Sequence, residues 1–465
     1  MENNDTIVIN RTNSKKMQRN APLSDKPLDI AVIGSGISGM SAAWLLSQKH
    51  NLTVFEKNDR IGGHTNTVEV IQNGTVTPID TGFIVYNEAN YPNFVELLKY
   101  LDVKTQASDM SFAVSLNQGK FEFGSSNTNS FFGQRSNIFN FDFWTMLTDI
   151  NKFFNEAKKL NFNGTKDSTL TLGEFLTQGH YGRTFIEKFI LPMGAAIWSS
   201  KPDDIRNQPA TTFIKFFSSH GLLQFKNPIQ WQTVIGGSRE YIKKLTAKYS
   251  QHIKINKKVK SIIRKDGRIR IIDALKDEYF FDHVVIATHA DEALGMLTDA
   301  EKKETEILGS FKYNNSRVIL HSDQSLMPKR KKVWSSWNFL GNTADGVSVT
   351  YWMNLLQSLD NKEQYFVSVN PQSEPEPDLL HKSFQYQHPY FNIEAWAAQK
   401  NLWHLQGNKN TWFCGSYFGY GFHEDALQAG LAVAEELGGI QRPWKIKANS
   451  GRIYRFSGSE RVASD

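Results

Sequence analysis

The sequence predicts an α/β fold in which an open sheet with flanking helices is interleaved with a second, α+β domain. A short apolar strand, Asp29 to Ile33, runs into Gly34-Ser35-Gly36-Ile37-Ser38-Gly39 and then into an apolar helix. A second apolar strand ends on Glu56, 17 residues after Gly39. Further buried strands end near Thr288 and Cys414, so the first sheet is predicted to be interrupted and later resumed.

The glycine turn predicts a Rossmann-like dinucleotide site. The first glycine permits a tight turn, the second lets a pyrophosphate approach bare backbone, and the third lets the helix pack against the strand. The phosphates would face the N-terminus of a helix predicted at residues 41–48, where unpaired N–H groups and the helix dipole favour an anion. Glu56 stands where an acid bonds ribose hydroxyls.

The remaining elements alternate along the chain. Helices are predicted at residues 91–101, through most of 137–222, and at 421–437. Strands are predicted at 253–287 and 333–370, and a hairpin at 110–124 with its turn at Asn117-Gln118-Gly119. The predicted organisation is a disordered polar arm (1–28), a nucleotide-binding domain (29–105, 225–292 and 408–438), a substrate-binding domain (106–224 and 293–407) and a basic aromatic tail (439–465).

Composition predicts a cytoplasmic protein. The chain has 465 residues, of which 40% are apolar, and its mean hydropathy is −0.44. Its longest nearly unbroken apolar run, Phe189 to Trp198, is about half of what a membrane-spanning helix needs. The N-terminus lacks the apolar core of a secretory signal. A single cysteine, Cys414, cannot form an internal disulfide and fits a reducing compartment.

Positive charge gathers at the C-terminus. The net charge is +6, and residues 440–465 carry six Lys or Arg against two acids, mixed with Trp444, Tyr454 and Phe456. Such a segment is either a solvated tail or a contact with the anionic surface of the inner membrane. No nucleic-acid motif accompanies the charge, so we predict no nucleic-acid partner.

Two further signals favour a flavin over a nicotinamide cofactor. The segment Arg60-Ile61-Gly62-Gly63-His64-Thr65 adds a second glycine pair, which lets backbone pass close to a larger cofactor. Near the C-terminus, a strand enters a turn at Gly415-Ser416, and a helix follows with Glu424 and Asp425 in its first turn. The N-terminus of this helix can face the other end of a long cofactor. The predicted cofactor is FAD.

These segments, together with residues 234–241, resemble the FAD-dependent amine oxidase and phytoene desaturase superfamily, in the same order over about residues 29–438. The resemblance implies a glutathione reductase-type FAD-binding domain with an interleaved substrate domain. Four longer strings, at 192–199, 219–223, 350–354 and 419–425, are similar to a bacterial flavoprotein group often encoded beside cyclopropane fatty acid synthase-like methyltransferases. That likeness implies desaturation of methyl-branched acyl chains on the route to furan fatty acids, and a lipid methyltransferase as partner.

The sequence departs from the amine oxidase pattern at three places. His64 replaces the arginine of Gly-Gly-Arg, Ser416 replaces the glutamate of Gly-Glu, and Phe422 stands where an aromatic cage wall is expected. An amine enzyme uses aromatic walls to hold the nitrogen. A histidine and two acids beside the flavin suit proton removal instead.

Motifs and resemblance together predict the site residues. The catalytic candidates are His423 and His220, because a histidine with a pKa of about 6.5 accepts protons near neutral pH, with Glu424 as an orienting acid. His423 could also contact the flavin or make a structural hydrogen bond, and His220 could end a helix. The predicted cofactor contacts are Gly34, Ser35, Gly36, Ile37, Ser38, Gly39, Glu56, Lys57, Arg60, Gly62, Gly63, His64, Thr65, Val259, Gly415, Ser416, His423, Glu424, Asp425 and Ala426.

Other reactive residues carry weaker predictions. Cys414 could form a flavin thioether, but its place in an apolar strand predicts a buried thiol. His64 could tether or stack on the flavin. The histidines show no H-x-x-x-H pattern and the chain has no C-x-x-C, so we predict no metal.

Three functions fit the sequence. The first is an FAD-dependent desaturase of a lipid acyl chain, most specifically a methyl-branched acyl group of a phospholipid, by hydride transfer to flavin N5 and proton abstraction by a histidine. The second is a flavin-containing amine oxidase. The third is a flavin-bound lipid carrier, or partner of a lipid methyltransferase, without turnover of its own. The His423 and Phe422 positions favour the first function over the second.

Overall fold

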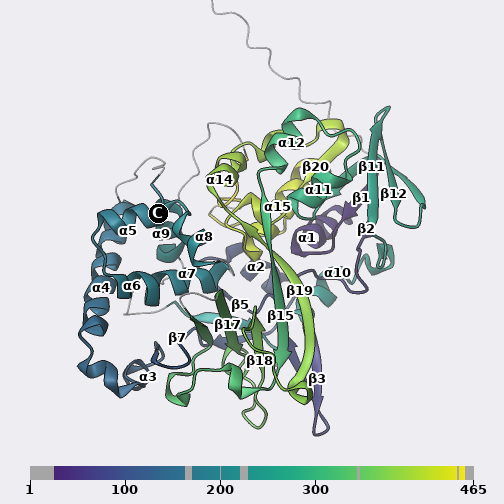
Figure 1. Ribbon diagram of the computed structural model, residues 1–465. Helices are drawn as coiled ribbons and strands as arrows, with labels where there is room; N and C mark the ends of the chain where they lie inside the picture. Colours follow the sequence, from purple (N-terminus) through teal and green to yellow (C-terminus); the bar gives the residue numbers. More distant parts are fainter. Residues whose placement is uncertain are drawn as a thin grey trace, which may run out of the picture.

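The computed structural model describes residues 26–162, 170–198, 201–219, 229–342, 346–447 and 450–455. The predicted polar arm lies outside the described residues apart from residues 26–28, and His220 also lies outside them. The prediction of a mixed α/β fold is confirmed: a parallel sheet, a larger mixed sheet and a layer of helices lie side by side (Figure 1). Among the described residues, no helix combines the length and apolar character needed to cross a bilayer.

The nucleotide fingerprint lies in a five-stranded, fully parallel sheet. Its order is β10-β2-β1-β14-β20. The strands are β1 (Asp29–Ile33), β2 (Asn51–Phe55), β10 (Ile253–Lys254), β14 (His283–Ile286) and β20 (Thr411–Phe413). The carboxyl ends of parallel strands meet at one edge, so Gly34, Glu56 and Gly415 are brought together although they are distant in sequence.

Two helices cover this sheet. Helix α1 (Ile37–Leu46) is buried along its whole length and packs beside α15 (His423–Gly438). Helix α1 begins four residues before the predicted start, because Gly36 takes an extended conformation (φ −67°, ψ 174°) and acts as its N-cap. Helix α2 (Pro92–Tyr100), predicted at 91–101, is confirmed and packs against α15.

A seven-stranded sheet lies below the parallel sheet (Figure 1). Its order is β19-β15-β18-β17-β16-β7-β8, and among its pairings β16 with β7 is parallel. The strands are β7 (Phe112–Leu116), β8 (Phe121–Gly124), β15 (Lys312–His321), β16 (Trp337–Asn342), β17 (Gly346–Trp352), β18 (Phe366–Val369) and β19 (Leu380–Tyr390). The predicted hairpin is confirmed: β7 and β8 join at Asn117-Gln118-Gly119, which have φ values of 51°, 55° and 83°.

Helices cover one side of this sheet and form a second core. They are α3 (Thr128–Phe131), α4 (Phe141–Phe162), α5 (Leu172–Gln178), α6 (Arg183–Phe185), α7 (Leu191–Trp198), α8 (Pro202–Arg206) and α9 (Ala210–Ser219). Their buried side chains are rich in phenylalanine, including Phe143, Phe153, Phe185, Phe213 and Phe217. The helical prediction for 137–222 is therefore confirmed for its described residues.

Smaller elements connect the layers. Strands β3 (Thr67–Gln72) and β4 (Thr75–Asp80) form a hairpin, and β5 (Val85–Asn87), β9 (Trp231–Val234) and β6 (Thr105–Ser108) form a three-stranded sheet. The connecting helices are α10 (Arg239–Thr246), α11 (Ala290–Met296), α12 (Lys302–Leu308), α13 (Met353–Leu356) and α14 (Ile393–Gln399).

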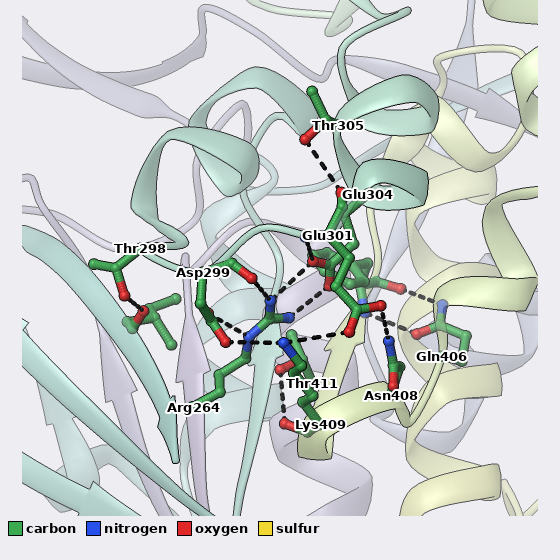
Figure 2. A network of polar contacts seen from close by, with 12 residues as sticks. Arg264, Thr298, Asp299, Glu301, Glu304, Thr305, Gln406, Asn408, Lys409 and Thr411 are labelled. Atoms are coloured by element: carbon green, nitrogen blue, oxygen red, sulfur yellow. Dashed lines mark hydrogen bonds and ion pairs between the residues drawn. The ribbon is translucent and has the colours of Figure 1, made fainter.

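An antiparallel sheet of β11 (Val259–Lys265), β12 (Arg268–Asp273) and β13 (Glu278–Phe281) stands beside the parallel sheet. A polar network fixes it to α12 and to the segment before β20 (Figure 2). At its centre Arg264 on β11 pairs with Glu304 on α12, and both side chains are 1% exposed.

The C-terminal segment corrects one prediction. A solvated tail is wrong for Arg442, Trp444 and Ile453, which are buried; Arg442 is 4% exposed and its guanidinium pairs with Glu435 at 2.6 Å. Trp444 stacks on Trp44 with ring centroids 5.8 Å apart, and Arg452 pairs with the buried Asp425. Deleting residues 440–465 would therefore remove packed core residues, and point variants are needed to test any membrane contact there.

Candidate functional site

A cavity of about 1810 Å³ runs from the carboxyl edge of the parallel sheet to the helical layer. Its wall includes the glycine turn at one end and residues of α3, α4, α7 and α9 at the other. Ligand pockets usually measure roughly 300–1,000 Å³. This cavity therefore has room for a large cofactor and a substrate together.

The glycine turn has the geometry of a phosphate cradle. The Gly34 N–H donates to the carbonyl of Phe55 at 2.9 Å, and its φ of +101° is one that other residues rarely adopt. A Cβ on Gly39 would lie 2.0 Å from the Gly34 oxygen, so only glycine allows this contact between helix and strand. A Cβ on Gly36 would meet nothing within 4 Å. The open space lies at the N-terminus of α1, where a pyrophosphate would bind.

The second glycine pair packs directly on the first turn. The Gly62 N–H donates to the Ser35 carbonyl at 3.0 Å, and a Cβ on Gly63 would lie 3.1 Å from the Gly36 Cα. The Arg60 guanidinium donates to the Gly63 carbonyl at 2.8 Å. This loop therefore adds a second stretch of backbone to the cradle, held in place by the Arg60 side chain.

Glu56 is positioned at the end of β2. Its Oε2 accepts hydrogen bonds from the Ser35 hydroxyl at 2.5 Å and the Ser35 N–H at 3.1 Å. Its Oε1 accepts from the Asn58 N–H at 2.8 Å. Oε1 also accepts from the Asn58 side-chain amide at 2.7 Å. A carboxylate has about four acceptor sites, so these four bonds hold the group firmly, and a ribose hydroxyl would bind it by replacing the Ser35 or Asn58 side-chain donor.

His423 lies in the cavity wall at the start of α15. Its ring stacks on Phe83, with centroids 3.8 Å apart and planes at 11°. Its Nε2 lies 2.7 Å from the Tyr241 hydroxyl, which also bonds Thr65. Stacking and the hydrogen bond therefore fix the ring in one orientation.

The expectation of an ordinary pKa for His423 is wrong. Burial lowers its pKa to about 3, because the aromatic surroundings penalise the charged imidazolium. His423 is therefore neutral at physiological pH, with a ring nitrogen able to accept a proton but only weakly basic.

Glu424 and Asp425 serve the fold, which corrects the predictions that placed them in the site. The Glu424 carboxylate is buried and accepts from the backbone N–H groups of Asn93 and Phe94 at 3.1 and 3.0 Å, so it caps α2. Asp425 accepts from the N–H of Phe422 at 2.8 Å and pairs with Arg452. Neither carboxylate lines the cavity.

Most of the other predicted contacts are brought together. Thr65 and Gly39 stand behind the wall, where Thr65 supports Tyr241 and Gly39 lets α1 approach β1. Cys414 is fully buried outside the wall, and burial raises the pKa of its thiol to about 12. The predicted contacts that line the cavity are Gly34, Ser35, Gly36, Ile37, Ser38, Glu56, Lys57, Arg60, Gly62, Gly63, His64, Val259, Gly415, Ser416, His423 and Ala426.

Two histidines that the sequence did not single out join His64 in the wall. His388 comes from β19 and His289 from the turn after β14, and the His64 and His388 rings lie 5.2 Å apart. The His64 Nε2, His289 Nδ1 and His388 Nδ1 atoms are buried without hydrogen-bond partners in the structure. Burial lowers the pKa of all three, that of His388 to about 4. Unpaired polar atoms beside the glycine turn fit a polar cofactor that would satisfy them.

The far end of the cavity is uncharged and mainly apolar, with Ser125, Ser126, Asn127, Thr128 and Gln230 as its polar wall residues. Its described wall residues between Phe112 and Trp231 include no Asp, Glu, Lys or Arg. Phe422 stacks on Phe216 at 4.8 Å and lies near Trp198, so the position of the expected cage wall faces the aromatic helices.

Comparison with known proteins agrees with this site. The profile of the family described as flavin containing amine oxidoreductase matches residues 37–438. Horse (Equus caballus) flavin-containing amine oxidase A is 44% identical over 66 residues, which cover 14% of this chain and 12% of that protein. The 4,4'-diapophytoene desaturase of Staphylococcus aureus is 33% identical over 87 residues, 16% of this chain and 17% of that protein. The chain thus matches less than a fifth of the length of these relatives.

Solved structures share the whole fold. A putrescine oxidase variant superposes with a TM-score of 0.65 at 13% identity, covering 89% of this chain and 99% of that one. The fatty acid isomerase of P. acnes that produces CLA gives a TM-score of 0.63 at 15% identity, covering 90% and 99%. At these identities the likeness establishes the fold.

Proposed function

We propose that this chain, which belongs to the flavin-containing amine oxidoreductase family and is an FAD-dependent oxidoreductase, desaturates a lipid acyl chain. The substrate is a methyl-branched fatty acyl group of a phospholipid, presented at the cytoplasmic face of the inner membrane. A lipid methyltransferase would supply the branch and act as partner. The FAD is held by a glutathione reductase-type domain built around the five-stranded parallel sheet.

The observation that carries the proposal is the apolar end of the cavity. An acyl chain gains free energy from leaving water for such a wall, about 0.8 kcal/mol for each methylene buried. A cationic amine would find no counter-charge in the described wall between Phe112 and Trp231, and burying an unpaired charge is costly. The wall therefore favours a hydrocarbon over an amine.

The cofactor-side residues have distinct roles in this proposal. The backbone of Gly34, Gly36 and Gly63 would cradle the pyrophosphate, and Glu56 would hold ribose hydroxyls. FAD, when bound, accepts a hydride equivalent from the substrate carbon. The neighbouring carbon must lose a proton for the double bond to form, and His423 is the wall residue whose neutral nitrogen we assign to receive it.

The low pKa of His423 gives a test of that role. Because its pKa is about 3, the neutral form persists as pH falls through 6.5, and protonation of His423 should not stop turnover in that range. We expect kcat to show no acid limb near pH 6.5 and the H423N variant to lose roughly 10²-fold or more in kcat. The measurement is kcat against pH from 5 to 8. An acid limb near 6.5 that vanishes in H423N would contradict the assigned pKa.

Anaerobic flavin reduction tests the function itself. The FAD-loaded protein is titrated with methyl-branched phospholipid, with unbranched phospholipid and with a polyamine, while the oxidised-flavin absorbance is followed. Bleaching by the branched lipid is expected. Bleaching by the polyamine alone would establish amine oxidation, and bleaching by none of them would favour the carrier function.

An amine oxidase is the second candidate, favoured by the fold shared with putrescine oxidase and by Asp109, a wall carboxylate three residues before Phe112; the other wall carboxylates are Glu56, Asp59 and Glu292. The Asp109 Oδ1 already accepts hydrogen bonds from the Ser111 N–H at 2.8 Å and the Ser336 hydroxyl at 2.6 Å. If amines are the substrates, D109N should raise the KM for a polyamine, whereas a lipid substrate should be unaffected.

A further inference from the structure

A corner of the helical layer exposes large apolar side chains that a soluble surface would normally bury. Phe139 is 91% exposed and Phe141 82%, and Ile138 and Trp144 beside them are 41% and 46% exposed. These four residues, here called the aromatic corner, lie between α3 and the start of α4, at the outer edge of the molecule (Figure 1). Contiguous exposed apolar groups of this kind mark interaction sites.

Cations lie on segments that contact α3, which precedes the aromatic corner in the chain. Helix α3 packs on the short helix Lys331–Val333, and a Cβ on Gly133 would lie 2.4 Å from a Val333 methyl carbon. Lys331 and Lys332 are exposed on that short helix, and the exposed Arg135 donates to the Asn129 side-chain oxygen at 2.6 Å and to the Phe132 carbonyl at 3.0 Å, so all three cations lie on segments that contact α3. Among the described residues no carboxylate pairs with Lys331 or Lys332; the adjacent Arg330 pairs with Glu122, and the Lys331 ammonium lies 5.5 Å from the Trp334 ring centroid. Asp142 is the one acid within residues 135–144.

The aromatic corner is continuous with the substrate end of the cavity. Trp144 contacts Phe132, with centroids 5.9 Å apart, and Phe132 contacts Phe131 at 5.3 Å. Phe131 lines the cavity, as do Ile150 and Phe154 further along α4. The helices that carry the exposed aromatics therefore also form the apolar wall.

We infer that the aromatic corner is a docking surface for an anionic lipid bilayer, from which an acyl chain enters the cavity between α3 and α4. Aromatic side chains insert at the headgroup boundary, and the flanking cations attract anionic lipid. The flanking cations Arg135, Lys331 and Lys332 favour a bilayer over a protein partner. They supply positive charge on an exposed surface, and the described residues around them form no pocket for a particular partner side chain. The nature of the entering chain rests on the proposed function, whereas docking itself does not.

The test is co-sedimentation of the FAD-loaded protein with vesicles of phosphatidylcholine, with and without phosphatidylglycerol. Wild type should bind the anionic vesicles more tightly. F139S/F141S should weaken binding roughly tenfold or more, because two largely exposed rings no longer insert. K331E/K332E should remove the gain from phosphatidylglycerol, again about tenfold, and this loss should shrink at high salt.

F280S is the matched control. Phe280 is also exposed (57%), but it lies on β13 of the three-stranded antiparallel sheet and not in the helical layer. F280S should bind vesicles like wild type. The proposal would be overturned if F139S/F141S bound vesicles as tightly as the wild type. It would also be overturned if K445E/K447E, in the C-terminal segment, lost binding instead. A wild type that binds no vesicles would overturn it too, and would leave a protein partner for this surface.

A second readout separates this inference from the proposed function. Branched phospholipid dispersed in detergent should reduce the flavin of F139S/F141S as well as that of wild type, because the cavity is unchanged. If F139S/F141S loses vesicle binding, and branched phospholipid reduces the flavin of neither protein in detergent or in vesicles, the desaturase is refuted while docking stands. Flavin reduction from vesicles at the wild-type rate in F139S/F141S would refute docking while the desaturase stands.

Discussion

The G36A variant is expected to fold like the wild type and to lose FAD. Gly36 has ordinary extended dihedrals (φ −67°, ψ 174°), and a methyl group there would touch no protein atom within 4 Å. The methyl group would instead occupy the space in which a pyrophosphate approaches the N-terminus of α1. We expect the Kd for FAD to rise by about 10- to 100-fold, or roughly 1.4–3 kcal/mol. Calorimetric titration of the apoprotein measures it.

G39A is the matched contrast, since the same methyl group is added three residues later. Its Cβ would lie 2.0 Å from the Gly34 oxygen and 3.0 Å from the Ala287 Cβ, so α1 must move away from β1. Overpacking of this kind costs about 1–3 kcal/mol, or more where backbone is involved. Urea unfolding should therefore separate the two variants. A G36A protein with wild-type FAD affinity would show that the phosphate binds elsewhere.

The cofactor half of the site was predictable because its signals are local. A turn followed by a helix dictates where Gly34, Gly36 and Gly39 must stand, and the parallel sheet brings Glu56 and Gly415 to the same edge. Gly34, Glu56 and Gly415 each follow the end of a strand within two residues. The hairpin at Asn117-Gln118-Gly119 was predictable for the same reason.

The residues whose positions were predicted wrongly are those whose contacts come from distant parts of the chain. Glu424 was expected to face the cofactor, but its carboxylate caps a helix 331 residues earlier in the chain. His388 gave no local signal, because its role depends on β19 passing the second glycine pair. Arg442 and Trp444 were predicted to lie in a solvated basic tail, because their partners Glu435 and Trp44 could not be identified from the sequence.

The pKa of His423 was missed for a related reason. Its ordinary value of about 6.5 applies in water, whereas Phe83 and Phe94 enclose the ring in the folded chain. Neither phenylalanine is close to His423 in sequence. Burial depends on the whole fold, so a titration property could not be inferred from the motif that contains the residue.

The R264A variant is expected to lose about 3–5 kcal/mol of unfolding free energy, because it leaves a buried carboxylate without its partner. The Arg264 guanidinium donates to both Glu304 oxygens, at 2.5 and 2.8 Å, and to Asp299 at 2.8 Å (Figure 2). Both Arg264 and Glu304 have side chains that are only 1% exposed. Bulk solvent therefore does not reach the Glu304 carboxylate to compensate fully for the lost guanidinium. Urea unfolding of the FAD-loaded protein measures the effect.

R270A provides the control on the neighbouring strand β12, where Arg270 pairs with Glu278. These side chains are 42% and 41% exposed, and exposed pairs contribute about 0–1 kcal/mol. R264M/E304M should recover much of the loss, because it removes the buried charge together with its partner. If R264A unfolds no more easily than R270A, the network does not fix β11 to α12. The antiparallel sheet beside the cofactor site must then be held by its apolar contacts, chiefly those of Ile262, Ile269 and Ile271.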